Sequence, residues 1–417
     1  MDPVGQPVEQ RLGAKTVEIK RTTVLGLVCV SHAINHLSSS ILPVLYPMFM
    51  RQFGFGYQGI ALLSNVNQLT ANSLQGIYGF IARFTGRGTL LGIGNLVVAL
   101  GGLGLGLAQG YPQILVSSAV RSAGSSPQHP TGAAMLVSHF PKDRARVLTL
   151  HQSAGNVGGW IGPWLAGAML FVMGWREMVW ILAVPSILMA LIYFGMRESL
   201  APAASAGGKG RAKLALADYK LALRNRNVLL ISLAMMAGAA GRGTGVLNTF
   251  LTPWLVDSYG VSDSKAAFFF GIMTFGGIVG PIALGWLAAR TSDKLMAQFV
   301  LVGSALLTVT VVLYPSASWL LGAHLLLAGG FIWARSPFFE TVITQASDES
   351  TLDTLLSVYF LISFASGPIW TQLTGTIFDH WGAAQAFGLM AGSYVVGDVI
   401  LSFVRIKPKQ GQAKAGG

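Results

Sequence analysis

Long apolar stretches separated by short polar segments run along most of this chain. A helix needs about 20 apolar residues to cross a hydrocarbon core of roughly 30 Å, and all of the stretches given below reach that length. The pattern predicts spans over 23–48, 58–82, 89–109, 112–138, 148–173, 177–196, 228–256, 264–288, 295–315, 318–344, 353–378 and 384–404. We therefore expect an all-α membrane protein with 12 transmembrane helices.

The longest polar connection, 197–227, divides these stretches into two sets of six. The expected organisation is an N-terminal tail (1–22), a six-helix bundle (23–196), a basic central loop (197–227), a second six-helix bundle (228–404) and a C-terminal tail (405–417). The first tail has no pattern typical of a cleaved signal peptide.

Basic residues are distributed unevenly between the predicted sides of the membrane. Of the 28 Lys and Arg residues, 22 lie in the tails and connections of one side, and the other side holds Arg51, Arg176 and Lys265. Cytoplasmic loops carry an excess of Lys and Arg, so both tails and the central loop are predicted to be cytoplasmic. The same asymmetry explains the net charge of +12, so we expect a lipid bilayer, specifically a bacterial inner (cytoplasmic) membrane, and no nucleic acid as partner.

Composition excludes several other classes of protein. Charged residues make up 11% of the chain, against about 25% in soluble domains, which excludes a soluble enzyme. The single cysteine, Cys29, excludes a disulfide framework and a site with several thiolate ligands. No Walker-type Gly-Lys-Ser/Thr motif is present. We expect no enzymatic activity, no cofactor and no resident metal, with transport driven by a gradient.

An internal repeat supports the division into two sets of helices. Pro47 and Pro253 differ by 206 positions, and so do Gly79 and Gly285. Further landmarks recur in order at the same or nearly the same offset. The pattern predicts two parallel six-helix repeats with a binding site between them near the membrane midplane.

These features resemble the major facilitator superfamily (MFS fold). Segment 79–88, Gly-Phe-Ile-Ala-Arg-Phe-Thr-Gly-Arg-Gly, resembles the superfamily's signature between helices 2 and 3, and segment 285–294 is its echo. Arg83 stands at a position where the usual signature has an acidic residue. Segment 158–167 is similar to the helix 5 signature of proton-coupled exporters. The resemblance implies gating or packing roles for Gly79, Arg83, Gly86, Arg87, Gly158, Gly162, Pro163, Gly285 and Arg290.

Three shorter segments resemble one particular branch of this superfamily. Ser-His-Ala-Ile-Asn at 31–35, the segment 124–130 and the segment 155–163 resemble the fosmidomycin-resistance branch of drug exporters. The superfamily resemblance implies alternating access by a monomer, and the helix 5 similarity at 158–167 implies efflux by proton antiport as the expected mode.

Ionisable residues inside the predicted spans are candidate functional residues, because each costs several kcal/mol to place in the membrane. In the superfamily that the chain resembles, helices 1, 4, 7 and 10 line the central cavity. Arginine remains charged and suits carboxylate or phosphonate oxygens. We expect a small organic anion or acidic drug to be bound by His36, Arg121, His129, Gln152, Asn156, Arg242 and Arg335.

Proton coupling needs groups that gain and lose a proton, and histidine titrates closest to physiological pH. The candidates are His32, His36, Glu340 and Asp398. On a helical wheel, His32, His36 and Pro43 share one face. His151 begins a stripe of glycines, for which close helix packing is the structural interpretation.

The sequence is also compatible with two other classes of transported substrate. His32, His36, His129 and His151 could bind a transition-metal ion, although nearby arginines oppose a cation. A lipid flippase of the same fold is the second alternative.

The cavity-lining helices are expected to be broken by four prolines: Pro47, Pro130, Pro253 and Pro337.

Overall fold

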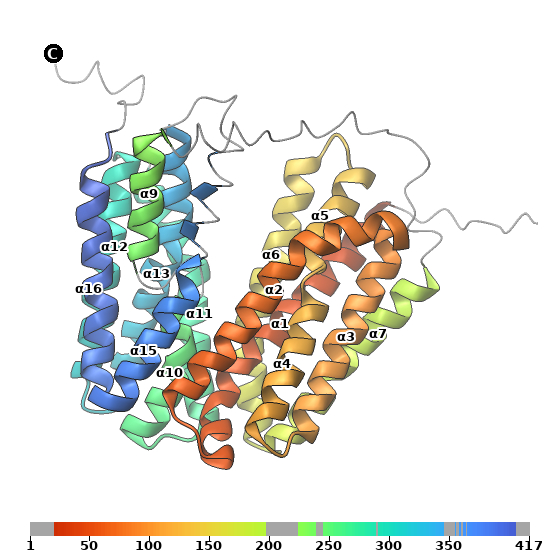
Figure 1. The fold of residues 1–417 in the computed structure, drawn as a ribbon, viewed down its shortest axis with the longest axis horizontal. Coiled ribbons are helices and arrows are strands. Elements are labelled where there is room, and N and C mark those ends of the chain that lie inside the picture. The colour runs from red at the N-terminus through yellow and green to blue at the C-terminus, as the bar shows by residue number, and fades with distance from the viewer. Residues whose placement is uncertain are drawn as a thin grey trace, which may run out of the picture.

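The computed structural model describes residues 21–196, 224–238, 245–288, 291–345 and 365–405, together with 355, 358–359 and 362–363. In these ranges the regular structure is helical. Figure 1 shows two groups of helices beside each other, one from each half of the chain.

The first group is formed by helices up to residue 195. They are α1 (Arg21–Phe53), α2 (Tyr57–Thr85), α3 (Arg87–Leu107), α4 (Tyr111–Ser125), α5 (Gln128–His139), α6 (Arg144–Leu170) and α7 (Trp175–Gly195). The second group comprises α9 (Arg226–Ala237), α10 (Gly245–Tyr259), α11 (Asp263–Ala288), α12 (Asp293–Thr310) with the 3₁₀ turn η2 (Val311–Leu313), α13 (Trp319–Gln345), α15 (Gly367–Trp381) and α16 (Ala383–Ser402).

Corresponding helices begin at the offset found in the sequence. The starts of α2 and α11, 57 and 263, differ by 206, as do those of α3 and α12, 87 and 293. Packing follows the same correspondence, because α3 packs against α4 and α7 while α12 packs against α13 and α16.

Within the described ranges, six helices are long and apolar enough to cross a membrane: α1, α3, α7, α11, α12 with η2, and α16. Helices α2, α6 and α13 are equally long but more polar, while α4, α5, α9, α10 and α15 are shorter. The predicted span 112–138 is divided into α4 and α5, and the predicted span 228–256 contains α9 and α10.

The positions of the helix breaks differ from the expectation based on proline. The break between α4 and α5 falls at Ser126–Pro127, whereas Pro130 lies in the first turn of α5. A first-turn proline is tolerated because its missing N–H would have no partner there. Pro47 and Pro337 lie inside the continuous helices α1 and α13.

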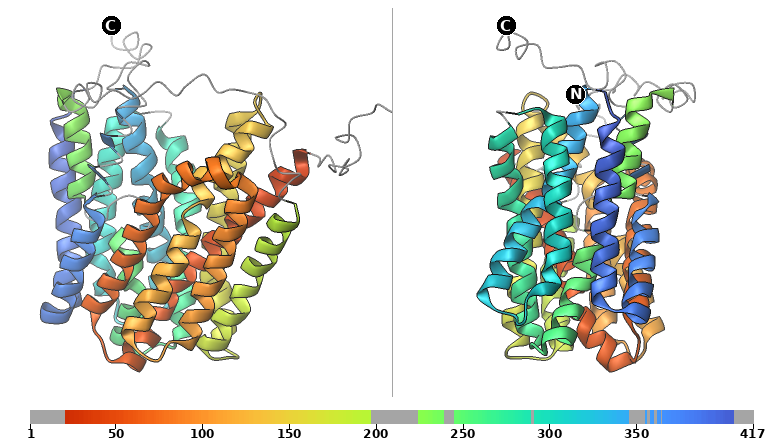
Figure 2. Two further views of the ribbon diagram at one scale, coloured as in Figure 1. Left: turned by 45° about the vertical axis from the view of Figure 1, so that its right-hand side comes forward. Right: turned by 90° about the vertical axis from the view of Figure 1, so that its left-hand side faces the viewer.

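The two groups adjoin through α2 against α15, α6 against α11 and α1 against α10. These contacts lie toward the lower ends of the helices in Figure 1, and both views in Figure 2 show the tall, roughly parallel arrangement. Buried apolar side chains of both groups form one continuous core cluster.

Candidate functional site

Four histidines from three helices meet in the first group. His32 and His36 lie one turn apart on α1, His129 is on α5 and His151 is on α6. The ring of His32 stacks on that of His151 with centroids 3.8 Å apart. It meets His36 and His129 edge-on at 4.6 and 4.9 Å, and His36 and His129 are 5.4 Å apart. We call these four residues the histidine cluster.

Close packing of α1 on α6 produces this arrangement. A β-carbon at Gly155 would lie 2.8 Å from the ring of His32, and one at Gly158 would overlap the carbonyl oxygen of Ala33. Glycine at both positions therefore lets the two backbones approach. A β-carbon at Gly162 would likewise overlap Ser40 on α1, and Pro163 beside it is buried in α6.

Several imidazole nitrogens of the cluster are buried without a hydrogen-bond partner. The Nδ1 of His32 lies 2.8 Å from the carbonyl oxygen of His151. By contrast, Nε2 of His32, Nε2 of His36 and both ring nitrogens of His151 have no partner among the described residues. A buried polar atom without a partner costs about 1–3 kcal/mol, so the cluster is suited to a proton or another ligand.

A polar network beside the cluster was not identified from the sequence. Ser31 donates to Gln128 at 3.1 Å, and the Asn95 amide donates to Ser31 at 3.1 Å. Ser125 donates to Asn35 at 3.0 Å. The available signal was Asn95, a polar residue in the middle of an otherwise apolar helix.

Arg121 lies on the opposite face of α1 from the histidines. Its guanidinium donates to the carbonyl oxygen of Ser38 at 3.0 Å, and Ser38 is about 200° around the helix from His36. The side chain lines a cavity of about 30 Å³ between α1, α3, α4 and α7, together with Ser186. Its Nε has no partner among the described residues.

Arg335 is buried in the second group of helices, with 1% of its surface exposed. It donates to the carbonyl oxygens of Ile332 and Gly238 at 3.1 and 2.9 Å, and its guanidinium lies 4.6 Å from the ring centre of Tyr394 on α16. The structure therefore does not bring Arg121 and Arg335 into one chamber. Arg242 lies outside the described residues.

The other predicted binding and coupling residues are dispersed. Gln152 and Asn156 are exposed on α6 and joined by a 3.4 Å hydrogen bond. Glu340 accepts a 3.4 Å hydrogen bond from Ser336 on α13. Asp398, on α16, has a buried carboxylate oxygen without a hydrogen-bond partner among the described residues. Both carboxylates belong to the second group, away from the histidine cluster.

The predicted gating residues outside α6 lie near the junction of α2 with α3 and near the end of α11. Gly86 joins α2 to α3 with a φ of 78°, and Arg87 donates to Ser138 at 2.9 Å. Gly285 lies in α11 with open space around it. Gly79 and Arg83 belong to α2, and the structure does not describe their surroundings. Arg290 lies outside the described residues.

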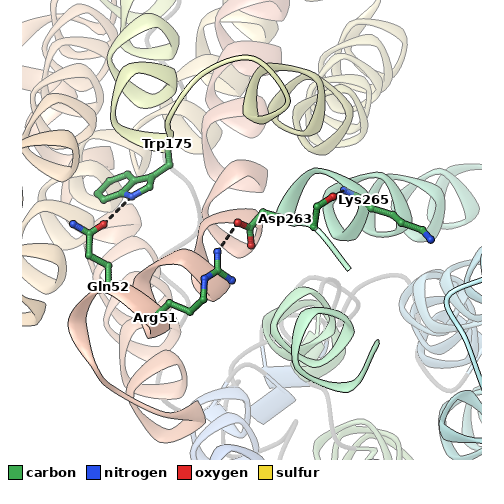
Figure 3. Close-up of polar contacts among 6 residues, drawn as sticks. Arg51, Gln52, Trp175, Asp263 and Lys265 are labelled. Carbon is green, nitrogen blue, oxygen red and sulfur yellow. Dashed lines mark hydrogen bonds and ion pairs between the residues drawn. The ribbon is translucent and has the colours of Figure 1, made fainter. Parts of the chain in front are cut away.

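At the opposite end, polar contacts join the two groups. Arg51 at the end of α1 forms a 2.5 Å ion pair with Asp263 at the start of α11. Figure 3 shows this pair beside the hydrogen bond from Trp175 to Gln52, while Lys265 points away from Arg51. Tyr57 donates from its hydroxyl to Asp257 at 2.7 Å. This end is the one that the basic-residue distribution predicts to face outside.

A comparison with protein-family models matches the Major Facilitator Superfamily over residues 28–371. The chain belongs to this superfamily. It is therefore a multi-pass membrane protein and a secondary transporter of small molecules, not an enzyme, as its sequence features predicted.

Individual relatives are distant but match most of the chain. The fosmidomycin resistance protein of Escherichia coli (strain K12) is 23% identical over 397 residues, covering 93% of this chain and 94% of the relative. The cis,cis-muconate transport protein of Acinetobacter baylyi is 25% identical over 353 residues, covering 82% and 84%.

The fold is similar to that of a bacterial homolog of the human lysosomal transporter Spinster, solved in an inward-facing and unoccupied conformation. The TM-score is 0.70 at 19% identity, covering 92% of this chain and 95% of that one. This similarity concerns the fold alone.

Proposed function

We propose that the protein exports a small organic anion in exchange for protons, with the histidine cluster as the proton-binding part of the site. The observation that supports this proposal is the concentration of four imidazoles in helices that contain almost no acid. Residues 21–196 include only Asp143 and Glu177, and both stand at helix ends.

The charge of the first group of helices favours a negative ligand. Arg121 is buried and bonded to a neutral carbonyl, so its positive charge is compensated by no carboxylate of this group. In a medium of low dielectric constant, such a charge attracts an anion far more strongly than it would in water. His36 and His129 are the partly exposed members of the cluster, and we assign to them the contact with the anion.

The exposed amides of Gln152 and Asn156 lie one turn apart on α6, which also carries His151. We assign to them the hydrogen bonds that orient the ligand. Arg335 contributes positive charge from the second group of helices without direct contact, and Arg242 remains a proposed contact.

Outward transport is supported by similarity to a resistance protein, and an anionic cargo by similarity to a transporter named for cis,cis-muconate. Exit of an anion and entry of a proton both move charge in the direction favoured by an inside-negative potential. That potential is worth about 2.3 kcal/mol per charge per 100 mV. Glu340 and Asp398 are the alternative proton carriers.

The experiment that tests this proposal is transport in proteoliposomes loaded with labelled organic carboxylates and phosphonates, with the membrane potential clamped. We expect an imposed pH gradient to accelerate anion movement in the wild type and not in His36→Gln or His129→Gln. His139→Gln is the matched control, because His139 is partly exposed and ends α5, away from the histidine cluster.

Two results would contradict the proposal in different ways. Movement of the anions that does not respond to the pH gradient would exclude proton coupling. Failure of every organic anion to move, in preparations that are folded and correctly inserted, would exclude the anionic cargo.

A further inference from the structure

We propose that His32, His36 and His129 form a binding site for a divalent transition-metal ion of the Zn²⁺ or Co²⁺ class. This inference does not depend on the anionic cargo. One ligand nitrogen from each of the three residues can be chosen so that all three lie within 4.8 Å of one another. The site joins α1 to α5.

The three nitrogens are slightly farther apart than in an occupied site. Zinc binds imidazole nitrogen at about 2.0–2.1 Å, so two nitrogens on one ion are separated by at most about twice that distance. His36 and His129 are partly exposed, and rotation of their side chains about χ1 and χ2 supplies the difference. The i, i+4 spacing already places His32 and His36 on one face of α1.

The hydrogen bond of His32 prepares this residue for metal binding. Because a carbonyl oxygen only accepts, the 2.8 Å contact with His151 requires the proton of His32 to be on Nδ1. Its Nε2 is then a bare lone pair, and it is buried without a partner among the described residues. Metal-binding histidines characteristically donate their second ring N–H to a backbone carbonyl in this way.

His151 supports the site without being one of the three ligands. Its ring lies nearly parallel to that of His32, with an interplanar angle of 19°. This stacking holds the His32 ring in place, while the His151 backbone provides the oriented carbonyl.

The donor set selects the class of metal. Imidazole suits zinc, cobalt, nickel and copper, whereas magnesium and calcium prefer oxygen ligands. Arg121 does not oppose the cation directly, because it bonds to Ser38 on the opposite face of α1. Three protein ligands leave one coordination position for water or an anion.

The test uses full-length protein purified in detergent, with any affinity tag removed and metals stripped by a chelator. Titration with Co²⁺ should produce the visible absorption bands of a nitrogen-ligated ion with a stoichiometry of one, and Zn²⁺ should abolish them by displacement. No transported substrate is present, so failure here is distinguishable from failure of the proposed function.

Variants identify the ligands. His36→Gln and His129→Gln should each weaken Co²⁺ binding by more than the 10–100-fold that loss of an outer partner costs. His151→Gln retains the carbonyl but loses the stacking on His32, so it should weaken binding less than His36→Gln or His129→Gln does. His139→Gln should bind within a few-fold of the wild type. Elution as a monodisperse species in size-exclusion chromatography shows that a variant is folded.

Absence of cobalt bands in the folded wild type would overturn the proposal. Equal binding by the wild type, His36→Gln and His129→Gln would also overturn it, because the ion would then be held elsewhere.

Discussion

The carboxylate of Asp379 accepts hydrogen bonds from the backbone amide of Tyr57 at 2.8 Å and from that of Gln58 at 2.9 Å. Asp379 lies in the last turns of α15, whereas Tyr57 and Gln58 begin α2 in the other group of helices. The acid therefore satisfies free N–H groups of a helix N-terminus and complements its dipole. A β-carbon at Gly56 would lie 2.5 Å from the same carboxylate. Glycine there permits this contact between the groups.

Replacing Asp379 should open this end of the molecule. Loss of an N-capping side chain costs about 0.5–2 kcal/mol, so Asp379→Ala should shift the equilibrium away from the closed arrangement by roughly 2- to 30-fold. Electron paramagnetic resonance would measure the shift with spin labels at Gln109 and Ser316, which are exposed at this end on different groups, after replacement of Cys29. Asp379→Asn retains one acceptor oxygen and should shift the distances less. Identical distance distributions for Asp379→Ala and the wild type would contradict this role.

The ion pair between Arg51 and Asp263 should contribute less than Asp379 does. Arg51 is exposed and Asp263 is partly exposed, with 51% and 22% of the side-chain surface accessible, and pairs near the surface are worth about 0–1 kcal/mol. We expect Arg51→Ala to shift the same label distances by less than about 5-fold, and the effect to decrease in high salt. The reversed pair, Arg51→Asp with Asp263→Arg, should restore only part of the effect, because the attraction is kept while both charges now oppose the dipoles of α1 and α11. A shift from Arg51→Ala larger than that from Asp379→Ala would show that the ranking is wrong.

Much of the helical arrangement was predictable because the length of an apolar stretch indicates directly whether a helix can cross a membrane. The offset of 206 found at Pro47 and Pro253 reappears in the starts of α2 and α11. The break at Pro127 was harder to predict, because Pro47 and Pro337 lie inside continuous helices, so the presence of a proline does not by itself locate a break. Pro130, three residues later, falls in a first turn and disrupts nothing.

The candidate site was predictable only in part. A helical wheel places His32 and His36 on one face of α1, and the structure adds His129 and His151 to them. The wheel does not identify the neighbour that a long side chain reaches. Arg121 and Arg335 each lie on the polar face of their helix. Each nevertheless bonds to backbone carbonyls inside its own group of helices. The contact between the groups through Asp379 depends on tertiary structure, and no sequence motif predicts it.

Adjacent glycines on α6 provide a matched pair for testing the α1–α6 contact. A β-carbon at Gly158 would overlap the backbone of Ala33, whereas one at Gly159 would find its nearest neighbour, Nδ1 of His36, at 3.9 Å. Gly158→Ala should force the helices apart and lower the thermal midpoint by several degrees, because overpacking typically costs about 1–3 kcal/mol. Gly159→Ala should leave the midpoint unchanged or raise it slightly, since alanine favours the helix. Differential scanning fluorimetry in detergent measures both variants, and equal midpoints would contradict close packing at Gly158.

Arg121 can be tested for an electrostatic role that is separable from stability. Among the residues that the structure describes, its hydrogen-bond partners are the carbonyl and hydroxyl of Ser38, at 3.0 and 3.5 Å. A buried charge that no carboxylate compensates is costly to keep out of water, and an apolar side chain of similar size removes that cost. Arg121→Met should therefore keep or raise the thermal midpoint while it lowers anion transport, because the positive potential that attracts the ligand is lost. Arg176→Met, at the exposed end of α7, controls for loss of a charge in general. Unfolding at a midpoint many degrees lower, with transport per folded molecule unchanged, would show instead that Arg121 serves only to hold α4 against α1.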